Sequence, residues 1–222
     1  MREALVLRLL AEAAALNAAA VDDEYRDPFW MDRYGERGRK FALSDGMHHF
    51  GYLAEAVRAG SPGVLVKYTR WLRSVLVTRG MCSEHLADGF RIRARKIAAL
   101  MWPDGEPALD LLAAAVDALT YEHPPAADLV PLPVDDVLPR FTALGLADRR
   151  HDARHLLSYL ADALAFERPS LLHEHLAWRV GFERRRGRPA RQLHDFLAAL
   201  ASRLADGGPA RALLVVAAES LP

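Results

Sequence analysis

The chain repeats itself at an interval of 107 residues. Residues 33–98 align without a gap with residues 140–205, and 17 of the 66 aligned pairs are identical. Residue composition alone would give about six identities, so the similarity indicates a duplicated structural unit. The identical pairs include residues that often have defined structural roles: Asp45/Asp152, His48/His155, Tyr52/Tyr159, Pro62/Pro169, Trp71/Trp178 and Gly80/Gly187. We therefore expect two copies of one fold in this chain.

Helix-starting and helix-ending residues recur at the same places in both copies. Pro62 and Pro169 suit the first position of a helix, and Gly80 and Gly187 suit its end. No stretch alternates β-branched and polar residues as a strand would. The sequence therefore predicts an all-α fold, a tandem duplicated helical bundle with two pseudo-symmetric repeats.

Each repeat is expected to begin with a short entry helix, near 28–37 in the first copy and 135–144 in the second. Three longer helices follow, and Ser44 and Ser83 are the predicted N-caps of two of them. Further helices are expected near 1–20, 107–122 and 209–219. The predicted domains are residues 1–123, a proline-rich linker at 124–133, and residues 134–222.

The overall charge and the single cysteine limit the function classes. The 29 basic and 29 acidic residues cancel, so no global field attracts nucleic acid or an anionic membrane. The basic segment 182–192 is interpreted as a solvated or interface-facing helix end. One cysteine, Cys82, excludes an intrachain disulfide and favours a reducing cytoplasm.

The N-terminal twenty residues resemble a signal peptide only superficially. Charged residues interrupt the segment, and their spacing leaves one apolar stripe formed by Leu5, Leu9, Ala13 and Leu16. This pattern predicts an amphipathic helix of the folded domain, not a secretory or membrane segment. A second stripe is rich in alanine and is expected to contribute to a homodimer or partner contact, or to be satisfied within the chain: Ala11, Ala14, Ala15, Ala18 and Ala19.

The repeated pattern Asp-x-x-His-x-x-x-Tyr is the first candidate site. It occurs as Asp45, His48 and Tyr52, and again as Asp152, His155 and Tyr159, and offsets of three and four place each trio on one helix face. In one interpretation the trio lines a ligand pocket, with His48 or His155 as axial ligand of a tetrapyrrole metal. In the other, Asp and His hydrogen-bond while His and Tyr fasten the helix to its neighbour. Retention in both copies favours the second interpretation.

Two further pairs of residues are candidate ligands of a cofactor or a metal ion. Trp71 and Trp178 occupy matching helices and are expected to be buried core anchors, with stacking on a cofactor as the alternative. His151 and His155 have the spacing of a two-histidine metal clamp. Ser44 replaces His151 in the first copy, so a metal site would exist in the second copy alone.

One segment resembles a known bacterial module. It reads DPFWMDRYGERGRKFALSDGMHHFGYLAEAV at 27–57, followed by YTRWLRSVLVTRGM at 68–81. This segment is similar to the helical N-terminal module of cobalamin-binding sensory proteins, over residues 27–100 and more weakly over 135–205. The Asp-x-His-x-x-Gly loop that holds cobalt in the Rossmann-like domain of that family does not occur here. The resemblance therefore implies a sensory or regulatory context without that domain.

Three functional hypotheses follow from these observations. The leading one is a non-enzymatic, helical sensory module that contacts a protein partner or a second copy of itself, as a homodimer. It expects no cofactor, no nucleic acid and no membrane. The second is a binder of a tetrapyrrole (heme, bilin or cobalamin) held by His48 or His155 with Tyr52, Tyr159, Trp71 and Trp178. The third is a metalloprotein or oxygenase that uses His151 and His155.

Overall fold

The computed structural model describes residues 2–129 and 150–221, without the side chains of Arg150, His151 and Asp152. Over these residues the chain forms nine α-helices, one 3-10 helix and no strand, which confirms the all-α prediction. The chain divides into two compact units. Unit 1 comprises Met1–Ser74 and His85–Leu119, and unit 2 comprises Val75–Glu84 and Thr120–Pro222.

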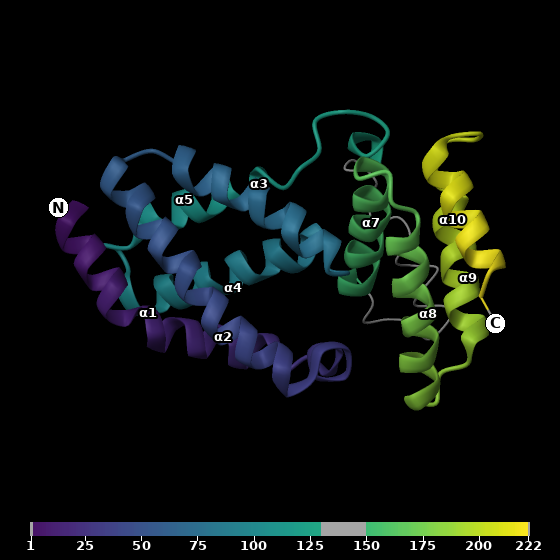
Figure 1. The fold of residues 1–222 in the computed structure, drawn as a ribbon, viewed down its shortest axis with the longest axis horizontal. Coiled ribbons are helices and arrows are strands. Elements are labelled where there is room, and N and C mark those ends of the chain that lie inside the picture. Colours follow the sequence, from purple (N-terminus) through teal and green to yellow (C-terminus); the bar gives the residue numbers. More distant parts are fainter. Residues whose placement is uncertain (1, 130–149, 222) are drawn as a thin grey trace. The chain divides into compact units, whose positions relative to one another are not determined.

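Most helices belong to a single unit (Figure 1). Unit 1 contains α1 (Arg2–Glu24), α2 (Pro28–Ala59), α5 (Glu106–Asp117) and the larger parts of α3 (Gly63–Thr78) and α4 (Ser83–Met101). Unit 2 contains η1 (Ala127–Leu129), α7 (Arg150–Ala165), α8 (Ser170–Arg185), α9 (Ala190–Ala201) and α10 (Pro209–Glu219). It also contains residues 75–84, where α3 ends and α4 begins, although the sequence places them within the first repeat.

The N-terminal helix packs as its hydrophobic pattern predicts. Leu5, Leu9, Ala13 and Leu16 are all buried, and α1 lies against α2. By length and composition α1 could also cross a membrane, a property it shares with core helices of soluble proteins. The burial of one stripe shows that α1 contributes to the core of unit 1.

Helix α2 begins with a short segment where the entry helix is predicted, but a kink at Gly35 replaces the turn predicted before Ser44. It runs from Pro28 to Ala59, and the only irregular residue inside it is Gly35, with φ 60° and ψ −164°. The Asp27 side chain caps its start by accepting a hydrogen bond from the Phe29 amide at 2.9 Å. The prediction that Ser44 is an N-cap is therefore wrong, because Ser44 lies inside the helix that follows the kink at Gly35. The equivalent entry helix at 135–144, and linker residues 130–133, lie outside the described residues.

Local geometry recurs at the 107-residue offset. Helix α8 begins and ends 107 residues after α3, and α9 begins 107 residues after α4. Gly80 and Gly187 both end helices in the left-handed region, with φ of 83° and 70°. Gly60 and Glu167 also correspond, with φ of 63° and 50°, so the second copy keeps the left-handed turn where it lacks the glycine. The recurrence supports the inference that the copies share one fold.

Unit 2 has a continuous apolar core. Helices α7, α8, α9 and α10 pack side by side (Figure 1). Their inward faces carry the large side chains of Tyr159, Leu160, Leu172, Phe196 and Leu197. Val77, near the end of α3, and Cys82, just before α4, join the same cluster. The thiol of Cys82 is therefore a buried core group.

Candidate functional site

Three aromatic residues of unit 1 form a stack. The rings of Tyr52 on α2 and Tyr68 on α3 lie 3.9 Å apart and nearly parallel, at 16°. Trp71 lies 6.0 Å from Tyr68 on its own helix, at 35°. Tyr68 is buried, but Tyr52 is 41% exposed and Trp71 is 58% exposed. The structure thus brings together two of the predicted site residues, Tyr52 and Trp71, through a third aromatic ring.

Unit 2 contains the same stack at the equivalent positions. Tyr159 lies 3.8 Å from His175 at 19°, and His175 lies 6.0 Å from Trp178 at 34°. Here Tyr159 and His175 are buried and Trp178 is half-buried. The arrangement of the rings is shared, whereas the exposure of the tyrosine differs between the units. The prediction of a buried core anchor is wrong for Trp71, because its ring lies at the outer end of the stack.

The first trio does not form the predicted hydrogen bond. His48 is exposed, and neither its side chain nor that of Asp45 makes a hydrogen bond within the described chain. The reason is that α2 turns the following residue, His49, toward α3, where His49 Nδ1 lies 2.7 Å from Tyr68 Oη. The prediction therefore selected the wrong histidine of the adjacent pair.

His49 is held in its neutral form. Burial lowers its pKa well below the ordinary value, and the positive charge of Arg93 acts in the same direction. Burial likewise raises the pKa of Tyr68. A neutral imidazole and a neutral phenol therefore share this hydrogen bond, as a polar part of a packed core.

Arg93 connects three helices of unit 1. From α4 its guanidinium donates to Asn17 Oδ1 at 2.8 Å and to Glu24 Oε1 at 3.2 Å, both on α1. Asn17 in turn donates to the Leu43 carbonyl on α2 at 2.8 Å. Burial raises the pKa of Glu24, and Arg93 opposes that rise. This charged network is buried, so its members must remain paired.

In unit 2, the segment between α3 and α4 packs onto α7. We call residues 75–84 the first tip. The amide and hydroxyl of Ser83 each donate to the buried carboxylate of Asp162 at 2.6 Å, and the Tyr121 hydroxyl donates to the same carboxylate. The Tyr159 hydroxyl donates to the Gly80 carbonyl at 2.9 Å. Asp162 therefore accepts hydrogen bonds from two segments of unit 2 that are distant in the sequence.

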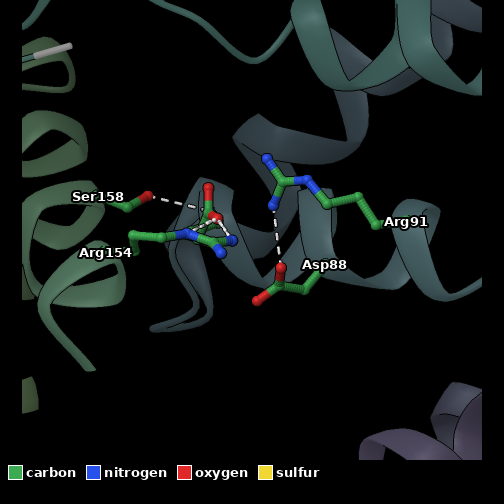
Figure 2. Close-up of polar contacts among 5 residues, drawn as sticks. Asp88, Arg91, Arg154 and Ser158 are labelled. Atoms are coloured by element: carbon green, nitrogen blue, oxygen red, sulfur yellow. Dashed lines mark hydrogen bonds and ion pairs between the residues drawn. The ribbon is translucent and has the colours of Figure 1, made fainter. Parts of the chain in front are cut away.

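Three more hydrogen bonds hold the first tip. Arg154 Nε donates to the Glu84 carboxylate at 2.8 Å, and the Glu84 amide donates to Ser158 at 2.9 Å (Figure 2). Arg168 donates to the Thr78 carbonyl at 3.1 Å. We call the recipient surface the α7 face, consisting of Arg154, Ser158, Tyr159 and Asp162. Both ends of the first tip are therefore hydrogen-bonded within unit 2.

The equivalent surface of unit 1, which we call the α2 face, consists of Met47, Gly51, Tyr52 and Glu55. Met47, Tyr52 and Glu55 are exposed, and the predicted ligand His48 adjoins them on the same helix. The α2 face thus remains open where the α7 face is filled.

The second trio is a packing motif as far as the structure describes it. Tyr159 is fully buried and His155 is also buried. The side chains of Asp152 and His151 lie outside the described residues, and so do the predicted Asp152–His155 hydrogen bond and the His151–His155 clamp. Among the side chains that are described, no three of His, Cys, Asp or Glu are grouped to hold a metal ion.

Several residues of these sites carried weak sequence signals. Asp162 is a lone carboxylate within the apolar run at 156–165, and it lies three residues after Tyr159 on one helix face. This spacing could have marked it as a buried acceptor. Ser83 was predicted only as a helix cap. Nothing in its local sequence indicates that it contacts Asp162, 79 residues away.

Comparison of the chain with protein-family models, curated proteins and solved structures finds no match.

Proposed function

We propose that the chain is a non-enzymatic helical sensory or regulatory module that acts through protein–protein contact, with the α2 face and Trp71 as its contact surface. The observation that carries this proposal is the open aromatic stack of unit 1. Its counterpart Tyr159 is covered by the first tip, while Tyr52 and Trp71 are exposed.

Exposed aromatic rings of this kind favour protein recognition. Tyrosine and tryptophan are enriched among the residues that dominate binding energy at protein interfaces. Tyr52 and Trp71 rest on the buried Tyr68, so little side-chain freedom is lost when a partner covers them. The resemblance of residues 27–100 to a sensory-protein module and the single buried Cys82 support a regulatory role in the cytoplasm.

A second candidate function is binding of a tetrapyrrole such as heme, a bilin or cobalamin. The observation that favours it is the exposed imidazole of His48, which lies one helical turn from Tyr52. An exposed imidazole beside aromatic rings offers an axial ligand and a stacking surface. The metalloprotein alternative depends on His151, whose side chain is not described.

Absorption spectra and metal analysis separate these functions. The proposal predicts that the purified protein has no visible band and no stoichiometric iron, cobalt or zinc, and that added hemin, cobalamin or biliverdin does not saturably quench its tryptophan fluorescence. A Soret or visible band that disappears in His48→Ala would contradict the proposal and establish the tetrapyrrole alternative. Bound metal that is lost in His155→Ala would establish the metalloprotein alternative.

A further inference from the structure

The contact between the first tip and the α7 face shows what fills a surface of this kind. Gly80 ends α3 with φ 83° and presents its carbonyl to the Tyr159 hydroxyl. Two residues later, Cys82 enters the core of unit 2, and Ser83 donates to Asp162. A helix-hairpin tip with a left-handed glycine is therefore one known occupant of this helix face.

A second tip exists at the equivalent position of the other copy. We call residues 182–191 the second tip. They run from the last turn of α8 to the start of α9, and Gly187 among them has φ 70°. The backbone hydrogen bonds also correspond: the Met81 amide donates to the Leu76 carbonyl, and the Arg188 amide donates to the Glu183 carbonyl, both at 3.0 Å. The two tips thus have the same backbone shape.

Both the second tip and the α2 face are exposed. Residues 184–189 are all exposed, and α9 begins after Pro189 without a side-chain cap. On the α2 face, Tyr52 repeats the ring position of Tyr159, with its stack on residue 68 matching the stack on residue 175. The second tip is therefore the exposed counterpart of the first tip, and the α2 face is the exposed counterpart of the α7 face.

We propose that the second tip of one molecule docks on the α2 face of a second copy of this chain. The inference rests on the proposed function and names the partner of the same surface. In this arrangement Gly187 takes the place of Gly80, and its carbonyl accepts from the Tyr52 hydroxyl. The aromatic stack of unit 1 then becomes covered as that of unit 2 is.

The charges of the two surfaces are complementary. The second tip carries five arginines: Arg184, Arg185, Arg186, Arg188 and Arg191. On α2, Glu55 stands at the position of Asp162, and Asp45 lies on the same helix face at its other end. The Glu55 carboxylate pairs with Arg58 at the surface, and such exposed pairs exchange readily. In the docked arrangement Arg191, at the position of Glu84, lies beside Met47, at the position of Arg154. Asp45 and Glu55 are then the acidic groups on either side of the arginine-rich tip.

Sedimentation velocity over 5 to 200 µM tests the proposal with charge reversals. The wild-type chain should associate in this range. Glu55→Arg and Arg191→Glu should each weaken association at least tenfold, because each places like charges across the contact. An equimolar mixture of these two variants should regain association, because each chain then offers a complementary surface to the other. Glu219→Arg, on α10, is the matched control and should associate as the wild type does.

Three results would overturn the proposal. One is a wild-type chain that remains monomeric at 200 µM. Another is association that neither Glu55→Arg nor Arg191→Glu weakens while both variants keep the wild-type circular dichroism and melting temperature. The third is a Met47→Cys, Arg191→Cys chain that forms its disulfide within one molecule, because the tip would then occupy its own chain. A colourless, monomeric protein would leave contact with another partner intact, whereas a bound pigment would contradict the proposed function itself.

Discussion

The buried carboxylate of Asp162 accepts hydrogen bonds from both the amide and the hydroxyl of Ser83, each at 2.6 Å. Ser83 begins α4, so a carboxylate from α7 neutralises the positive end of that helix. The same carboxylate also accepts from Tyr121. The first tip is therefore fastened to unit 2 by a satisfied buried acceptor.

Asp162→Asn should destabilise unit 2 by about 2–4 kcal/mol, because an amide brings hydrogens toward groups that are themselves donors. Urea unfolding measures the loss. Asp195→Asn, at a partly exposed carboxylate, is the control and should change stability by less than about 0.5 kcal/mol. The only cysteine, Cys82, gives a second readout, because loosening of the tip should speed its reaction with a thiol reagent. Equal stability of the two variants would contradict the role assigned to Asp162.

Gly46 and Gly51 provide a matched pair on α2. A Cβ at Gly46 would lie 1.8 Å from Asn17 Oδ1, whereas nothing lies within 4 Å of a Cβ at Gly51. Gly46→Ala should therefore cost about 1–3 kcal/mol and disturb the contact of Asn17 with Arg93. Gly51→Ala should stabilise the protein by about 0.5–1 kcal/mol through helix propensity. Thermal melting checks both, and a stable Gly46→Ala variant would mean that α1 and α2 pack less closely than described.

The neutral state of His49 predicts a loss of stability in mild acid. Its pKa is lowered in the folded chain, while the unfolded chain binds a proton near pH 6.5, so folding becomes less favourable as pH falls below that value. The loss is at most about 1.4 kcal/mol for each pH unit. The raised pKa of Glu24 has the opposite sign and acts at lower pH, nearer the ordinary range of a carboxyl group.

Urea unfolding at pH 7.5, 6.5 and 5.5 measures this dependence. His49→Gln keeps a hydrogen-bonding side chain beside Tyr68 without a titrating group, and should flatten the curve. His48→Gln removes only the smallest of the three causes that lower the pKa of His49, and should change the curve far less. An unaltered slope in His49→Gln would show that another group controls acid stability.

Glu167 is a non-glycine residue with φ 50°, where the equivalent Gly60 has φ 63°. Glu167→Gly should stabilise the protein by about 0.5–1 kcal/mol, because glycine adopts this conformation without a steric penalty. Gly60→Ala should destabilise it by about 1 kcal/mol for the same reason. Melting temperatures of the two variants should move in opposite directions. A destabilised Glu167→Gly would indicate that the Glu167 side chain has a role of its own.

Helix punctuation could be predicted from the sequence, because it depends on local conformational preference. Gly80, Gly187 and Pro209 mark helix boundaries as expected, and the stripe that contains Leu9 is buried. The choice between His48 and His49 could not be predicted, because it depends on the helical phase that follows the kink at Gly35. Contacts between residues distant in the sequence could not be predicted either. Periodicity assigns Asp162 to a helix face, but only the assembled unit brings Ser83 to it.

The small-residue stripe of α1 is the competing interface. Ala11, Ala14 and Ala15 are exposed beside Leu7 and Leu10, as the sequence suggested. Removal of the whole helix would also remove the buried Asn17 and Glu24, so a surface change is the cleaner test. If the tip contact accounts for association, Ala14→Arg should sediment as the wild type does. Dissociation by Ala14→Arg would place the interface on α1.

Hydroxyl-radical footprinting read by mass spectrometry tests the central claim most directly, because it reports the exposure of individual side chains. At 1 µM protein, Met47, Tyr52 and Trp71 should oxidise rapidly while Tyr159 and His175 are protected. At 200 µM, the α2 face and residues 184–189 should become protected together. Equal oxidation of Tyr52 and Tyr159 in dilute protein, or no change of Tyr52 with concentration, would contradict the account.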